Sequence, residues 1–207
     1  MPVTPFQAAT DVLERGRGFL ALDVESTEPL TREDLRRAAL VSGVAALDTY
    51  LHWEIRKIKL ASPLPQKLAE VDVPFSDLVA MGEKSVRSRK RGVRDRPRTS
   101  ARDTLNDRLL TMTFQDRKGV ERALQMLGAE KPWRKLSKAI EPSTSPEALQ
   151  RRLNEISHRR NKIVHEGDLR RLVKPRAITH EKITSESVRA DLDWIESFIS
   201  ALHSIVD

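Results

Sequence analysis

Apolar residues recur at helical spacing along most of this chain, and this pattern is the strongest constraint on its fold. Near the C-terminus one face is made of Val188, Leu192, Ile195, Ile199, Leu202 and Val206. Runs of alternating β-branched residues between Asn-Gly or Asp-Gly turns, which would indicate hairpins, do not occur in the sequence. The sequence therefore predicts an all-α protein folded as a helical bundle.

The length of the chain favours a single domain. At 207 residues, one continuous core is the ordinary arrangement. Neither repeats nor a convincing internal boundary divides the sequence. We expect one helical domain over residues 1–207, with residues 84–102 forming a basic connector within it.

Capping residues and prolines mark where helices begin and end. The clearest start has Ser145 as N-cap, Pro146 at the first helical position and Glu147 after it, and Gly167 is a natural stop. Pro97 is expected to interrupt the helix that begins near Phe75, and Thr99 or Ser100 to cap the helix that follows. The expected helices run from Thr31 to about Leu60, from Phe75 into the basic segment, over 101–113, over 117–127, over 132–140, from Ser145 to Gly167, and from Thr184 or Ser185 to the C-terminus.

Positive charge is concentrated in one internal segment. Residues 84–102 contain nine basic residues and one acidic residue, whereas the whole chain has a net charge of +7. A dense basic segment attracts polyanions and speeds their encounter with the protein. Aromatic residues make up 4% of the chain, so phosphate contacts should outweigh base stacking. We expect nucleic-acid binding through Arg89, Lys90, Arg91 and Arg94; the alternative is a solvated loop or the exposed face of a frayed helix.

The sequence also narrows the cellular setting. It contains no cysteine, which excludes disulfides, thiolate metal sites and cysteine nucleophiles and fits a reducing cytosol. No apolar run reaches the roughly 18–20 residues that span a bilayer. The segment Met1–Leu20 carries Asp11 and Glu14 and lacks the pattern of a signal peptide. We expect a cytoplasmic protein without membrane contact.

The helix expected from Ser145 carries an unusual arrangement of polar residues. Arg160 falls inside its apolar stripe, which spans about 80° and consists of Leu149, Leu153, Ile156 and Ile163. A buried arginine is costly unless it is paired or faces a polar cavity. His158, Asn161 and His165 share a second face, and His165 is about 140° from Arg160. One site can use both Arg160 and His165 only if the last turn of the helix unwinds at Gly167 or if a second copy of the chain supplies the missing partner. This favours a site on a two-fold axis.

These residues resemble the motif of a known family. Arg160 and His165, with Asn161 beside the arginine, have the order and spacing of the HEPN ribonuclease motif. Segment 159–168 resembles the motif helix of the RiboL-PSP type of HEPN domain. Segments 45–52, 114–115 and 123–128, and Trp133 beyond them, resemble the same type, and the similarity covers residues 31–206 in the right order. The basic segment 84–102 is not assigned to the family pattern and is an elaboration of this chain.

The resemblance implies a helical homodimer in which two motif helices face each other across one cleft. It also implies cleavage of RNA without a metal or other cofactor, in toxin–antitoxin or antiviral defence systems with a restraining partner protein. RNA brings its own nucleophile, the 2′-hydroxyl; a histidine supplies an acid or base near neutrality, and an arginine supplies a fixed cation. The expected roles are general acid/base catalysis for His165, transition-state stabilisation for Arg160, and orientation of the phosphate or the histidine for Asn161.

Three further polar residues are candidates for supporting roles in the cleft. Asp48 and His52 are spaced i, i+4, which equally fits a structural hydrogen-bonded pair. His158 fits a solvated surface more readily than the cleft.

Other chemistries and functions remain open at this point. Glu166 and Asp168 could join the histidines as metal ligands, but no second acid–histidine cluster supports this, and Lys162 would oppose a cation. A non-catalytic HEPN module that binds RNA or protein and dimerises is the main alternative to an enzyme. A DNA-binding protein that uses the basic segment is a third.

Overall fold

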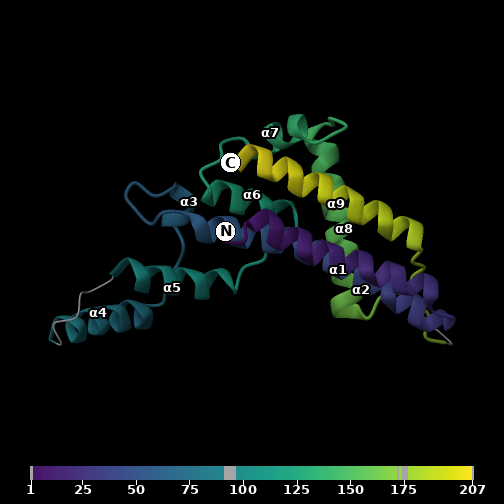
Figure 1. Ribbon diagram of the computed structural model, residues 1–207, viewed down its shortest axis with the longest axis horizontal. Helices are drawn as coiled ribbons and strands as arrows, with labels where there is room; N and C mark the ends of the chain where they lie inside the picture. The colour runs from purple at the N-terminus through teal and green to yellow at the C-terminus, as the bar shows by residue number, and fades with distance from the viewer. Residues whose placement is uncertain (1, 91–96, 172, 174–176, 207) are drawn as a thin grey trace.

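The computed structural model describes residues 2–90, 97–171, 173 and 177–206. Over these residues the chain is all-helical, which confirms the expected fold class, and the strand-type pairing consists of one isolated bridge between Leu169 and His180 (Figure 1). None of the described helices combines the length and apolar character that crossing a membrane requires. The helices are α1 (Pro5–Glu25), α2 (Pro29–Lys57), α3 (Gln66–Ala69), α4 (Phe75–Lys90), α5 (Pro97–Leu109), α6 (Arg117–Met126), α7 (Pro132–Ala139), α8 (Pro146–Glu166) and α9 (Ser185–Val206).

The centre of the core lies between α1, α2 and α9 (Figure 1). α1 and α2 pack along each other, and α9 lies against both. The approach of α9 to α2 is close, because a Cβ on Gly43 would lie 2.4 Å from Cδ2 of Leu192. The buried side chains of these three helices include Leu13, Leu20, Leu40, Leu47, Tyr50, Leu51, Leu192, Phe198 and Leu202.

The strongest local signals in the sequence are confirmed. The Ser145 side chain accepts a hydrogen bond from the backbone N–H of Ala148 at 3.1 Å and so caps α8. Gly167 ends α8 with φ +60°, a left-handed conformation that glycine adopts without strain. Thr184 caps α9 through the N–H of Ser187.

Other helix boundaries differ from our expectations. α5 begins at Pro97 rather than after Thr99 or Ser100, because proline fits the first turn of a helix, where its missing N–H has no partner to lose. α2 begins at Pro29 for the same reason, and ends at Lys57. We did not expect α1, although Thr4 and Gln7 form a capping box at its start.

α4 and α5 project from one end of the bundle as an arm (Figure 1). α4 packs against α5, and α5 is tied to the C-terminal end of α2. The tie is the guanidinium of Arg102, which donates hydrogen bonds to the carbonyl oxygens of Arg56 and Ile58. The basic connector therefore begins on a helix that stands apart from the core.

Two helical glycines provide a matched test of this packing. A Cβ on Gly119 would lie 2.6 Å from the carbonyl oxygen of Thr113 and 2.9 Å from the Cα of Phe114, whereas a Cβ on Gly18 would meet nothing within 4 Å. We expect Gly119→Ala to lower the free energy of unfolding by about 1–3 kcal/mol. Gly18→Ala should raise it by about 0.5–1 kcal/mol, because alanine loses less backbone entropy on folding. Urea unfolding measures both; a Gly119→Ala protein as stable as the wild type would contradict the close approach.

Candidate functional site

α8 carries the candidate catalytic residues and is anchored by its apolar stripe. Leu149, Leu153 and Ile156 are buried, and Ile163 packs against the core with partial exposure. Arg160 lies on this stripe and is half-buried, as the helical wheel predicted. α8 runs across the α1–α2 pair (Figure 1) and contacts α2, α6 and α7.

The guanidinium of Arg160 turns toward the polar face of α8. Its Nη1 donates a hydrogen bond of 3.1 Å to Oδ1 of Asn161, while its Nε is buried and has no partner among the described residues. Asn161 and His165 are about 40° apart around the helix, so the cation is brought toward the face of His165. α8 stays helical to Glu166, so the first of our two alternatives, an unwound last turn, is wrong. It is the bend of the Arg160 side chain, and not a change in the backbone of α8, that directs the guanidinium toward the face of His165.

Arg159, the neighbour of Arg160, has a structural role. Its guanidinium lies 2.7 Å from Oδ1 and 2.8 Å from Oδ2 of Asp168, and it also donates to the carbonyl oxygen of Glu181. Asp168 is completely buried, and Nε of Arg37 in α2 donates to its Oδ2 at 2.9 Å. Two arginines on one buried carboxylate thus fix the end of α8 against α2.

The face beyond Arg160 is open. Asn161 and His165 are exposed, and Val164 is 47% exposed. Within the described part of the chain, His165 forms neither a hydrogen bond nor an ion pair. Its imidazole is therefore free to meet a ligand or a second chain.

His158 lies at a different place on the same helix. It lines an open groove of about 560 Å³ together with Arg117, Gln150 and Asn154. The backbone N–H of Arg117 donates to Oδ1 of Asn154 at 3.1 Å, which joins α6 to α8. His158 precedes His165 by a rise of about 10 Å along the helix axis, so one chain does not bring the two imidazoles together.

Asp48 and His52 form a structural pair beneath α8. Asp48 accepts hydrogen bonds from the backbone N–H of Phe114 at 2.6 Å and the side-chain amide of Gln115 at 3.2 Å. Nε2 of His52 lies 3.7 Å from Oδ1 of Asp48, and its ring packs on Phe114. The carbonyl oxygen of Gln115 in turn accepts a hydrogen bond from Ser157 of α8. The pair therefore supports α8 through the loop before α6.

The two acids that we weighed as metal ligands are held by arginines. Glu166 pairs with Arg171 at 2.6 Å, and Asp168 pairs with Arg37 and Arg159. Across the described residues, no three His, Asp or Glu side chains lie close enough together to hold a metal ion.

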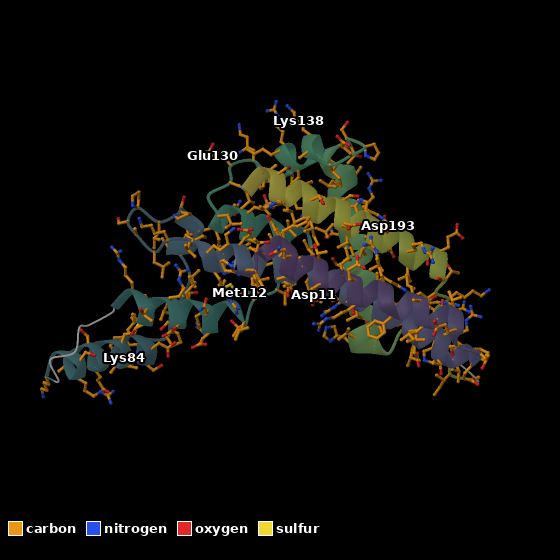
Figure 2. All side chains as sticks on the ribbon, viewed as in Figure 1. Asp11, Lys84, Met112, Glu130, Lys138 and Asp193 are labelled. Carbon is orange, nitrogen blue, oxygen red and sulfur yellow. The ribbon has the colours of Figure 1, made fainter. Side chains whose placement is uncertain are left out.

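The basic residues expected to bind nucleic acid lie away from α8. Arg89 and Lys90 belong to α4, and Lys90 is exposed, while Arg91 and Arg94 lie outside the described residues. Figure 1 shows α4 well separated from α8, and Lys84 marks the same arm in Figure 2. Within one chain, α4 is not brought next to Arg160 and His165.

Sequence reasoning missed Arg37 and assigned no role to Arg159. The adjacent arginines at 159 and 160 were a signal that one of them could be structural, but the sequence does not say which. Arg37 meets a carboxylate 131 positions later, and no local pattern marks that contact.

Comparisons with protein-family models, with curated proteins and with solved structures found no match to this chain.

The buried carboxylate gives a stability prediction. Asp168→Asn should lower the free energy of unfolding by about 3 kcal/mol, because it leaves Arg37 and Arg159 without their shared counter-charge. Asp193→Asn is the matched control: this aspartate pairs with Arg17 at the surface of α9, where it is 59% exposed (Figure 2), and the loss should stay below about 1 kcal/mol. Chemical unfolding of both variants measures the difference, and equal losses would show that burial of the carboxylate is unimportant.

His52 gives a prediction about pH. Burial lowers the pKa of His52 below its ordinary value of 6.5; Asp48 opposes this shift, and Arg56 adds to it. The folded protein thus binds this proton less readily than the unfolded chain does. This contribution to the free energy of unfolding is fully present above pH 6.5, the pKa of histidine in the unfolded chain. It is lost as the pH falls through the pKa of His52 in the folded protein.

We therefore expect the free energy of unfolding to fall between about pH 7 and pH 5, and to fall less in His52→Gln. Denaturant midpoints at both pH values measure the slope. His158→Gln, at an exposed histidine, should keep the wild-type slope; a wild-type slope in His52→Gln would show that this ring is not the cause.

Proposed function

We propose that this protein is a metal-independent endoribonuclease of the HEPN type. The observation that carries the proposal is the contrast between two adjacent arginines. Arg159 is held by the buried carboxylate of Asp168. Arg160 has no ion pair among the described residues and makes a single hydrogen bond, to Asn161. A guanidinium with spare donors, on the side that leads to the exposed ring of His165, suits a phosphate ligand.

The proposed reaction is an internal transesterification of RNA. The 2′-oxygen attacks the adjacent phosphorus, the bond to the 5′-oxygen breaks, and the products end in a 2′,3′-cyclic phosphate and a 5′-hydroxyl. A base takes the proton of the 2′-hydroxyl, and an acid gives a proton to the departing 5′-oxygen. His165 serves in these proton transfers, Arg160 stabilises the charge that builds up on the phosphate oxygens, and Asn161 orients the guanidinium and the phosphate.

A homodimer supplies what one chain lacks. One histidine at the site covers one of the two proton transfers, and a second copy with its α8 opposite the first adds another. The exposed Asn161, Val164 and His165 leave this face of α8 uncovered in the single chain, which supports such a pairing. The proposed cleft lies between the two α8 helices.

The basic segment 84–102 is proposed to add affinity for RNA rather than chemistry. Because α4 lies away from α8 (Figure 1), the segment would contact RNA at a distance from the cleaved phosphate, through counterion release. A role as a toxin or antiviral defence effector, in the cytoplasm and under a restraining partner, belongs to the same proposal.

The test is cleavage of total RNA by purified protein in the presence of a chelator, with the fragment ends mapped. The wild type should give cyclic-phosphate and 5′-hydroxyl ends. His165→Ala should reduce the rate by about 10²–10⁴-fold and Arg160→Ala by about 10²–10³-fold. His180→Ala, at another exposed histidine, is the matched control and should cleave at the wild-type rate.

Two outcomes would overturn this proposal. Cleavage at the wild-type rate by His165→Ala would remove the assigned acid/base, and RNA binding without cleavage would favour the non-catalytic module. In cells, induced wild-type protein should slow growth, and Arg160→Ala should relieve that effect.

A further inference from the structure

A row of positive charge lies on the outer face of α7. Its four cations are spaced i, i+3, i+4 and i+7, which places them on one side of the helix. All four are exposed, and together with one acid, Glu130, they line an open hollow of about 250 Å³. These cations, which we call the α7 patch, are Lys131, Arg134, Lys135 and Lys138.

The cations of the α7 patch form no ion pair with any described residue. On other helices, exposed cations at the same spacing have acidic partners. Arg15 of α1 pairs with Asp11 at 2.9 Å. Arg87 of α4 pairs with Glu83 at 3.3 Å. Like charges three and four residues apart repel along a helix, so the unpaired row lowers the stability of α7, and a bound polyanion would relieve the repulsion.

The backbone of Lys131 is a second unusual feature of the patch. Lys131 is the N-cap of α7 and has a left-handed conformation with φ +48°. Residues with a bulky side chain rarely adopt this conformation, and at functional sites such strain is retained for what the side chain does. A lysine cannot cap the helix either, because its ammonium group only donates hydrogen bonds. The conformation does place Lys131 at the same hollow as the other three cations.

The surroundings of the patch favour a phosphate backbone as its ligand. Every residue between Leu110 and Val164 is described, and no large hydrophobic side chain in this stretch is exposed. Protein partners bind mainly through aromatic and aliphatic anchors, and lysine is depleted in their interfaces. Nucleic acid needs cations alone, and a duplex carries about one negative charge per 1.7 Å of its axis. The patch, about 10 Å long from Lys131 to Lys138, spans several such charges.

We propose that the α7 patch binds the sugar–phosphate backbone of the RNA substrate, several nucleotides away from the cleaved phosphate. The inference rests on the proposed ribonuclease for the identity of the ligand. α7 lies at the end where α8 begins, whereas Arg160 and His165 lie near the other end (Figure 1). The rise from Pro146 to Arg160 is about 21 Å, or about six nucleotides of a stacked strand. Contacts to phosphates position the RNA without selecting its bases.

The test uses the full-length protein with His165→Ala, so that the RNA stays intact, and a fluorescent RNA of about twenty uridines, long enough to pass both ends of α8. Fluorescence anisotropy at several salt concentrations measures the affinity and its salt dependence. Lys135→Gln with Lys138→Gln should weaken binding by about ten-fold at low salt, and should lower the slope of log affinity against log salt by about 1.4. Lys135→Arg with Lys138→Arg should bind as the parent does.

A matched pair of substitutions separates the patch from net charge. Arg15→Gln with Lys67→Gln removes the same charge from two exposed ion pairs, on α1 and α3, and should leave the affinity within about two-fold of the parent. Glutamine favours helix about as much as lysine does. The α7 pair should therefore melt at or above the parent temperature, because it also removes like-charge repulsion.

A crosslink locates the contact independently of affinity. The chain contains no cysteine, so Glu130→Cys introduces a single thiol beside the hollow and leaves its four cations in place. A photocrosslinker on this thiol should couple to the RNA. Asp11→Cys is the matched control: it also removes an acid, lies on α1 away from Glu130 and Lys138 (Figure 2), and should couple at background level.

The outcomes separate this inference from the proposed function. RNA binding that needs the α7 patch, without cleavage by the wild type, would support the patch and overturn the ribonuclease alone. Equal weakening by the α7 pair and the control pair would mean that net charge alone acts, and would overturn the patch. Unchanged RNA binding, together with patch-dependent binding of vesicles that contain anionic lipid, would assign α7 to a membrane surface instead.

Discussion

The buried carboxylate of Asp168 is the interaction on which the candidate site depends. Asp168 follows the glycine that ends α8, has φ +57°, and lies back against α2, where Arg37 and Arg159 share its two oxygens. Its own carbonyl oxygen accepts a hydrogen bond from the N–H of Glu181 at 2.9 Å, which closes the connection toward α9. Removing a carboxylate from water is costly, and two guanidinium groups within 2.9 Å of its oxygens offset that cost. The end of α8 is therefore fixed in both position and rotation.

This rotation determines which side chains are left for chemistry. With Arg159 directed into the protein, the next residue is turned by about 100°, so Arg160 lies on the apolar stripe and Asn161 lies at the surface. The polar face of the last two turns of α8 is exposed, while the apolar stripe of the same helix packs against the core. A site on such a rigid element keeps its geometry when a ligand binds, which is what stabilisation of a transition state requires.

Local signals predicted much of the fold, and long-range contacts explain what they missed. Ser145, Gly167 and Thr184 act on backbone groups within a few residues, so their roles were visible in the sequence. Asp48 meets the loop at Phe114, 66 positions away, and the sequence therefore left its role open between cleft and support. The helical wheel placed Arg160 on the correct stripe, but it assumed that the side chain points in the direction set by the backbone. A long side chain can bend, and the guanidinium of Arg160 bonds to the neighbouring amide of Asn161 while the backbone stays helical to Glu166.

α2 connects the end of α8 with the arm. Arg37 near its start holds the end of α8, and the carbonyl oxygen of Arg56 near its end receives Arg102 of the arm, about 28 Å away along the helix. A packed helix tied at both ends has one arrangement, whereas coupling between distant sites needs an element with two.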